Sequence, residues 1–569
     1  MRDPQLLASH SVRTEFPLAA ATAGPAPVGS APSVAGPQRR LDRFELGLLA
    51  VFAAFSMWVL ALDLWQVVVH DRVWTGTDGF FIVDQMQYLA WIQSASHHLL
   101  AANLFVLRGT PSDYFQPAVA ISGVIAALGV APWLTLLLWK PVAVLGTFFA
   151  VRAYANRNLE VRLQRRVALT LGIFFGSFSV VYGAFGTVGD MMPDFLSWGY
   201  PFGLMALALI VFALLGYDRA RSAGLVVWAP GLLGAVASTL HPWQGELLIL
   251  IVGAAELIRW RELKTSWRSL ALPVVTVALT GLPLLYYVLL GHLDLSWGLA
   301  RQASKHTFSF WSIALGVAPL AVFALLGYRG RPRDFFELMT RLWPVAAMAI
   351  YFLSATALSA TPLHAFNGIT VPLAVLAVGG VSRSGLMHRV PRARLIAGLA
   401  VALGVIPANA YALAVAHQFT DPTPGNANFI TSGERDALDY LNRDPDPGGV
   451  LTQFYLGEVV PARTGRHTLV GDCLWSEPRC MPRSLTADAL FDGALSPRAA
   501  KQFARQSGAR FVLASCHAQL DLRRELGSMI VSVRRFGCAT VYELGLPSAA
   551  EGPLAELPGN AAVRAPRRQ

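Results

Sequence analysis

Two aspartates that could act on a hydroxyl group follow the first long apolar run of the chain. Asp78 comes after a Thr-Gly-Thr turn, and Asp84 lies six residues further on. A carboxylate placed beside a hydroxyl group can take its proton as a general base, and we predict this chemistry for one of the two. For each residue the alternative is an ordinary solvated loop carboxylate.

The residues after Asp84 predict a helix that lies along the membrane surface. Gln87, Tyr88, Trp91 and Ile92 have the spacing of an amphipathic helix. Helices of this kind rest at the interface with their apolar side chains in the lipid. We therefore expect the aromatic side chains of this helix to face lipid.

A second acidic pair, Asp190 and Asp194, lies in a short segment that has no basic residue. Side chains four positions apart share one face if the segment turns helically. Two carboxylates on one face suit a divalent cation such as Mg²⁺ or Mn²⁺, or a general base. The alternative, which the sequence favours equally, is that the two aspartates belong to an ordinary solvated loop.

Basic and imidazole side chains supply candidate ligands for an anionic substrate. Arg301, Lys305 and His306 form a cation cluster between two apolar runs. The fork of an arginine matches the oxygens of a phosphate, so we predict that this cluster binds one. His241 begins a His-Pro-Trp turn and His364 lies in another turn, and both are weaker candidates for substrate binding. The alternative for these histidines is a hydrogen-bonded turn residue, and for the cation cluster a solvated loop.

The composition requires a membrane around these side chains. Of the 569 residues, 54% are hydrophobic and 14% are charged, whereas about 25% are charged in a soluble domain. Mean hydropathy is +0.47. A cytosolic enzyme, a disordered scaffold and a fibrous protein are therefore excluded. The chain interacts with a lipid bilayer.

Charge and motifs exclude two further classes of partner. The net charge of +11 is spread over short clusters between apolar runs and forms no basic stripe, so we expect no nucleic-acid partner. The sequence has no phosphate-binding loop and no dinucleotide fingerprint. We therefore expect no nucleotide cofactor.

The apolar runs predict a polytopic α-helical membrane protein of about eleven spans. About 20 apolar residues cross a bilayer, and several of these runs are shorter. The stretch 118–130 is predicted to be a short interfacial or re-entrant helix, because Pro132 cuts it off. The predicted spans are 44–69, 133–153, 167–186, 202–217, 223–240, 246–259, 269–291, 311–328, 343–360, 367–382 and 396–416.

The distribution of basic residues orients these spans. With the N-terminus inside, the inner segments carry 24 Lys and Arg and the outer loops carry 4. The positive-inside rule then predicts a multi-pass plasma-membrane protein with a cytoplasmic N-terminus and an extracytoplasmic C-terminal part. Residues 1–43 are predicted to be a disordered cytoplasmic tail, and 70–132 a long first outer loop.

Beyond the last span the sequence changes character and predicts a small extracytoplasmic α/β domain over 417–545. Short apolar runs alternate with charged segments there, as in domains that mix helices and strands. The tail 546–569, rich in Pro, Ala and Arg, is predicted to be disordered. Helices are expected at 434–441 and 497–506, and strands at 450–454, 510–515 and 540–544.

All 4 cysteines of the chain lie in this predicted outer domain. An even number in an oxidising compartment predicts disulfides. Three pairings are possible, and we favour the local ones, Cys473 with Cys480 and Cys516 with Cys538. A zinc site is the alternative, but the sequence has no Cys-x-x-Cys motif.

This layout resembles the GT-C class of integral-membrane glycosyltransferases over residues 44–545. Its acidic first outer loop contains Asp78, Asp84 and the sequence DQMQYLAWI, and a second outer loop holds the other acidic pair. A His241-Pro242 turn lies at the outer end of a span. The C-terminal domain contains GERDALDYLN, VLTQFYLGEVVPARTGR and GARFVLAS, phrases of a kind found in membrane proteins of this type.

The resemblance implies transfer of a hexosyl or pentosyl group from a polyprenyl-phosphate sugar to an extracytoplasmic glycan, lipid or protein acceptor. A first-loop aspartate would be the base, the second acidic pair would hold a metal or the acceptor, and the cluster at Arg301 would hold the phosphate. Two alternatives stay open. One is a transporter or flippase for a lipid or glycan, and the other is a non-catalytic assembly protein of the cell envelope.

Overall fold

The architecture is taken from a computed structural model of the chain. It describes residues 40–78, 81–107, 109–176, 191–260, 267–303, 310–353, 362–421, 426–476, 478–518 and 520–545. Contacts divide the chain into residues 1–43 and a second unit, 44–569, to which all features below belong. Most of the two predicted tails lies outside the described residues, as do Asp190, Lys305 and His306.

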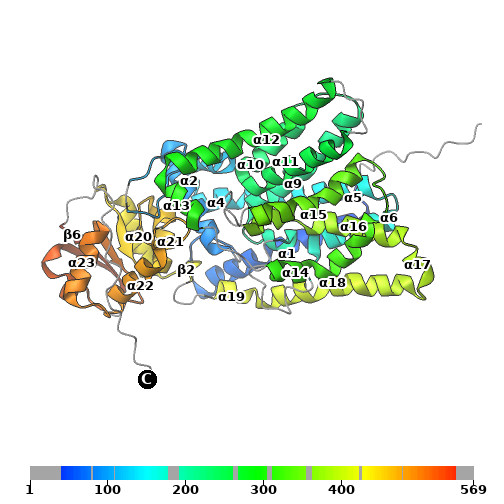
Figure 1. The fold of residues 1–569 in the computed structure, drawn as a ribbon. Helices are drawn as coiled ribbons and strands as arrows, with labels where there is room; N and C mark the ends of the chain where they lie inside the picture. The colour runs from blue at the N-terminus through cyan, green and yellow to red at the C-terminus, as the bar shows by residue number, and fades with distance from the viewer. Residues whose placement is uncertain are drawn as a thin grey trace, which may run out of the picture. The chain divides into compact units, whose positions relative to one another are not determined.

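The described part of the chain contains 8 helical segments long and apolar enough to cross a membrane (Figure 1). The predicted class, a polytopic helical membrane protein with a small C-terminal sheet region, is confirmed. The segments are α1 (Arg43–His70), α4 and α5 (Pro132–Leu137 and Trp139–Asn158), α9 (Pro201–Ser222), α12 (Trp267–Leu293), α14 with η1 (Phe310–Ala324 and Leu325–Tyr328), α15 (Phe335–Leu353), η3 with α16 (Pro362–Phe366 and Thr370–Arg383), and α18 with α19 (Ala393–Val415 and His417–Thr420).

The remaining three predicted spans coincide with helices that are shorter or more charged. These helices are α6 (Arg162–Phe174), α10 (Ala229–Leu240) and α11 (Pro242–Arg259). The second half of the span predicted at 167–186 lies outside the described residues. The predicted short helix at 118–130 coincides with α3 (Pro117–Ala127), which begins at a proline because a helix needs no N–H donor at its first position.

Arginines of the predicted inner segments pair with acids on neighbouring helices. Arg221 Nε lies 2.7 Å from Glu256 Oε1, which joins α9 to α11. Arg341 Nη2 lies 2.8 Å from Glu337 Oε1 within α15, and Arg383 of α16 reaches the same carboxylate at 3.1 Å. The basic residues that orient the chain thus also hold the helix ends together.

The helix after the first span is enclosed by protein. This helix, α2 (Ile82–His98), packs against α3 and against α21 (Phe454–Thr464) of the C-terminal region. Tyr88 and Trp91 are buried, with 7% and 4% of their surface exposed. The prediction that these aromatic side chains face lipid is wrong, because Tyr88 packs against Phe202 of α9 and Trp91 against Trp475 of the C-terminal region.

The C-terminal region contains a mixed sheet of 4 strands in the order β3-β4-β6-β5. β3 and β4 are parallel, with Leu451 opposite Val512, and the other two pairs are antiparallel. The strands and helices expected from the sequence coincide with β3, β4, β6, α20 and α23. The elements are α20 (Ser432–Arg443), β3 (Val450–Thr452), α21, α22 (Cys480–Phe491), α23 (Pro497–Ser507), β4 (Phe511–Ala514), β5 (Ile530–Phe536) and β6 (Ala539–Leu544).

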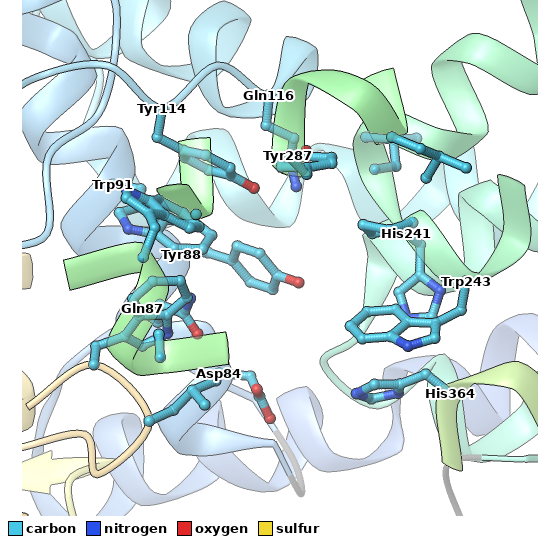
Figure 2. Close-up of a pocket in the computed structure, with 18 of the residues that line it drawn as sticks. Asp84, Gln87, Tyr88, Trp91, Tyr114, Gln116, His241, Trp243, Tyr287 and His364 are labelled. Carbon is cyan, nitrogen blue, oxygen red and sulfur yellow. The ribbon is translucent and has the colours of Figure 1, made fainter. Parts of the chain in front are cut away.

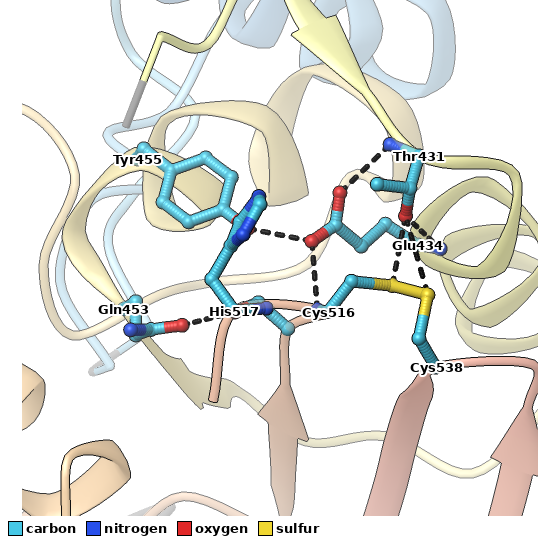
Figure 3. Close-up of a disulfide and its surroundings, with 8 residues drawn as sticks. Thr431, Glu434, Gln453, Tyr455, Cys516, His517 and Cys538 are labelled. Atoms are coloured by element: carbon cyan, nitrogen blue, oxygen red, sulfur yellow. Dashed lines mark hydrogen bonds between the residues drawn. A yellow bond between two sulfur atoms is a disulfide. The ribbon is translucent and has the colours of Figure 1, made fainter. Parts of the chain in front are cut away.

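A disulfide and a helix cap meet at one end of the strands of this sheet (Figure 3). Helix α20 begins with a capping box, in which Thr431 and Glu434 exchange side-chain to backbone hydrogen bonds. Glu434 Oε1 also accepts hydrogen bonds from the backbone N–H of Cys516, at 2.9 Å, and from the Tyr455 hydroxyl. Cys516 is bonded to Cys538, and Cys473 to Cys480, so the favoured local pairings are confirmed.

A short pair of strands joins the first outer loop to the C-terminal region. In β1 (Val73–Trp74) and β2 (Phe429–Ile430), Val73 pairs with Ile430 and Trp74 with Phe429 in antiparallel register. Backbone strands can pair only within one compartment. The loop after α1 and the C-terminal sheet therefore lie on the same side of the membrane.

Candidate active site

A cavity of about 260 Å³ lies beside the C-terminal region (Figure 2). Its other sides are formed by α2, the turn between α10 and α11, the C-terminal end of α12, and α13 (Leu295–Ala303). Aromatic and imidazole rings dominate its lining. The charged side chains that line it, among the described residues, are the acids Asp84 and Glu246.

Asp84 stands in the first turn of α2, where the positive end of the helix dipole favours a carboxylate. Its side chain points into the cavity from one side, and the rings of Trp243 and His364 lie on the other side (Figure 2). Burial raises the pKa of Asp84 to about 6, because the protein around it disfavours the charged form. At neutral pH the group is a carboxylate with a raised affinity for a proton, as a general base requires.

His241 ends α10 and caps α11, and Pro242 takes the first position of the new helix. Its ring lies 5.0 Å from the ring of His364 and 4.8 Å from that of Trp243, centroid to centroid. Burial and the nearby His364 lower the pKa of His241 well below its usual value, so the ring is neutral. Neither ring nitrogen of His241 has a hydrogen-bond partner among the described residues. The ring can therefore give one hydrogen bond and accept another from a ligand.

Four aromatic rings form a continuous wall of the cavity, and we refer to them as the aromatic wall. Trp297 stacks on Tyr114 with ring centroids 4.3 Å apart, and meets Trp475 edge to face at 4.4 Å. Trp91 contacts the other three rings at 4.4 to 5.7 Å. These rings come from α2, the following loop, α13 and the C-terminal region, so the wall exists only in the folded chain.

Of the two aspartates predicted as a base, the cavity contains only Asp84 among its described lining residues. Asp78 is buried and forms an ion pair with Lys140 of α5. Its backbone N–H also donates a 2.9 Å hydrogen bond to Gln85 Oε1, which ties it to the start of α2. Asp78 thus positions α2, and it lies at a separate small cavity with Lys140.

The second acidic pair is separated from this cavity. Asp194 lies in α8 (Pro193–Leu196), is completely buried and does not line the cavity. Burial raises its pKa well above the usual value. Asp190 lies outside the described residues, within which no three His, Cys, Asp or Glu side chains come together to hold a metal ion. The metal site predicted at Asp190 and Asp194 stays a prediction.

The three predicted phosphate ligands lie at the end of α13 and in the segment that follows it. Arg301 belongs to α13, the helix that contributes Trp297 and Ala300 to the cavity. Lys305 and His306 follow it outside the described residues. Both predicted histidines, His241 and His364, line the cavity.

Comparison with known proteins identifies the fold. No protein-family model matches the chain, and no curated protein matches it in sequence. The oligosaccharyltransferase of Archaeoglobus fulgidus, solved with a tethered acceptor peptide, is similar in structure: it is 13% identical, the match covers 85% of this chain and 70% of that one, and the TM-score is 0.50. The fold is that of the GT-C membrane glycosyltransferases.

A second structure, the mycobacterial arabinofuranosyltransferase AftD, matches with 14% identity and a TM-score of 0.49. The match covers 89% of this chain but only 42% of that much longer one. A shared fold fixes where elements lie and leaves the chemistry to the side chains. The side chains around the cavity at Asp84 therefore determine which reaction this chain can carry out.

Proposed function

We propose that this protein transfers a sugar from a polyprenyl-phosphate donor to a hydroxyl group of an extracytoplasmic acceptor. One observation carries the proposal: a carboxylate with a raised pKa, Asp84, faces imidazole and aromatic rings across a cavity. Cavities lined by rings and a few polar groups are typical of substrate sites. The GT-C fold supports the same reaction class.

In the proposed reaction Asp84 takes the proton of the acceptor hydroxyl. The acceptor oxygen forms a bond to the anomeric carbon of the donor sugar, and the bond from that carbon to the phosphate oxygen breaks. Polyprenyl phosphate leaves with the electron pair of the broken bond. A general base of this kind contributes about 10² to 10⁴ in rate.

His241 and His364 are the proposed ligands of the departing phosphate on the opposite side of the cavity. The neutral imidazole of His241 can donate one hydrogen bond to an oxygen of the phosphate, which stabilises the charge that develops there. Arg301 is the proposed cationic ligand, since α13 borders the same cavity.

The experiment is an assay of the purified full-length protein with a panel of polyprenyl-phosphate sugars and acceptors. We expect the wild type to form a product, and Asp84→Asn to lose at least about 10² of the rate. Asp71→Asn is the matched control, because Asp71 is an exposed acid of the same loop whose left-handed backbone an asparagine tolerates. Equal activity of Asp84→Asn and wild type would contradict the assignment of the base.

A further inference from the structure

Three tryptophans of the aromatic wall have buried indole N–H groups without a hydrogen-bond partner among the described residues. They are Trp91, Trp297 and Trp475, and all three line the same cavity. The side chains of Trp91 and Trp475 are buried, with 4% and 6% of their surface exposed. Buried donors in proteins are nearly always paired. Three orphan donors in one wall point to a ligand that brings its own acceptors.

We propose that the aromatic wall is a subsite for an uncharged sugar ring, and that the C-terminal region completes this subsite by supplying Trp475. The inference rests on the proposed function, because it places a glycan ring beside Asp84. A sugar ring has an apolar C–H face that packs on an aromatic side chain. Its hydroxyl oxygens accept hydrogen bonds from indole N–H groups.

Other ligands satisfy the wall less well. A phosphate has no apolar face to pack on the rings of the wall, and we place it on the other side of the cavity, at His241 and His364. A lipid tail would leave all three indole donors unpaired in an apolar contact, which is unfavourable. An organic cation would gain from the ring faces but has no acceptor for the N–H groups. A neutral sugar ring can pack against the faces of the aromatic rings and also accept hydrogen bonds from the indole N–H groups.

Trp475 is held in the wall by three separate restraints. Its backbone N–H donates to the carbonyl of Asp472 at 3.0 Å, and its own carbonyl accepts from Asn103 Nδ2 at 3.0 Å. The Cys473–Cys480 disulfide closes the short loop that contains it. Side chains fixed before binding lose little freedom when the ligand arrives, so they bind it more tightly. A tryptophan held in place by these three restraints is better suited to contact a ligand than a tryptophan that only packs at the surface.

The test is a binding measurement on the full-length protein in lipid nanodiscs. The probes are bare polyprenyl phosphate, polyprenyl-phosphate hexose and pentose, and a panel of free neutral oligosaccharides. We expect Trp475→Phe, which keeps a ring and removes the N–H, to weaken the sugar-bearing probe roughly 3- to 10-fold. Bare polyprenyl phosphate should bind unchanged. A loss for the lipid-linked sugar assigns the wall to the donor, and a loss for the free oligosaccharide assigns it to the acceptor.

Two further variants test whether the effect is specific to the aromatic wall. Trp297→Phe makes the same change from a different helix and should weaken the same probe by a similar factor. Trp311→Phe is the matched control, because Trp311 is 73% exposed on α14 and does not line the cavity. The proposal is overturned if no sugar-bearing probe binds the wild type, if both cavity variants bind sugars normally, or if bare polyprenyl phosphate is weakened equally.

The same variants separate this inference from the proposed function. If the wild type binds sugars through Trp475 but transfers none, the glycosyltransferase proposal fails and the subsite stands. If transfer occurs and the tryptophan variants bind and react like the wild type, the subsite fails and the enzyme stands. Retained disulfides and an unchanged melting temperature in each variant exclude misfolding as the cause.

Discussion

The side chain of Asn428 donates a 2.7 Å hydrogen bond to Asp63, although the two residues are 365 positions apart in the chain. Asp63 belongs to the first membrane helix and Asn428 to the start of the C-terminal region. Asn428 Oδ1 also accepts a 2.7 Å hydrogen bond from Thr77 in the first outer loop. One buried amide thus joins a helix, the loop after it and the distant domain that completes the cavity.

The pH dependence of transfer should follow Asp84. A base must be deprotonated, and burial raises the pKa of Asp84 to about 6. We therefore expect kcat/KM to be constant above that pH and to fall about tenfold per pH unit below it, since only the carboxylate fraction reacts. Initial rates from pH 4.5 to 8.5, with donor and acceptor well below their KM values, measure this. A profile without a fall below pH 6 would contradict the role of Asp84.

Asp78→Asn should damage the fold and not only the chemistry. Lys140 would be left buried without a counter-charge, which costs about 3–5 kcal/mol. Melting in detergent should show a large decrease for Asp78→Asn. The double variant Asp78→Asn, Lys140→Met should recover much of the loss, because it removes both charges. A single variant as stable as the wild type would contradict the structural role of the pair.

The four cysteines should be fully oxidised in the protein as isolated. Alkylation without reduction, followed by peptide mass mapping, should detect no free thiol and both local pairs. Replacing Cys516 and Cys538 together by serine should lower the free energy of unfolding by about 3 kcal/mol, because the bond closes a loop of 22 residues. Detection of four free thiols would also contradict the predicted extracytoplasmic location.

A reporter fused after Gly545 should behave as extracytoplasmic, and one fused after Asn158 as cytoplasmic. The charge bias of the loops predicts both results. The β1–β2 pair further requires the first outer loop to give the same result as the C-terminal fusion. Opposite results for these two positions would contradict the strand pairing.

Hydropathy was sufficient to predict most of the membrane helices, because a bilayer demands long apolar segments whatever their packing. It was not sufficient for α2. The spacing of Tyr88 and Trp91 indicates an apolar helix face but does not say whether lipid or protein covers it. The residues that cover it, Phe202 and Trp475, lie more than 100 positions away in the sequence, so no local pattern reveals them.

The residues that line the candidate site were predictable in part. Asp84, His241 and His364 lie in short segments between apolar runs. An ionisable side chain in such a segment can be picked out from the sequence as a candidate. The tryptophans of the aromatic wall gave no such signal, because a tryptophan in a membrane protein is usually an interface residue. The one available hint was Trp475, which lies between two cysteines whose pairing could be predicted from the sequence.

The β1–β2 pair has a consequence for the biogenesis of the protein. Its two strands are separated by all the later membrane helices, and translation at about 5–20 residues per second needs roughly 20 to 70 seconds to cover that stretch. During this time Trp74 lacks its strand partner Phe429, and Thr77 lacks its hydrogen bond to Asn428. We expect the loop to need protection by a chaperone or by the translocation machinery until the last domain emerges, and truncation before Phe429 to expose it to proteolysis.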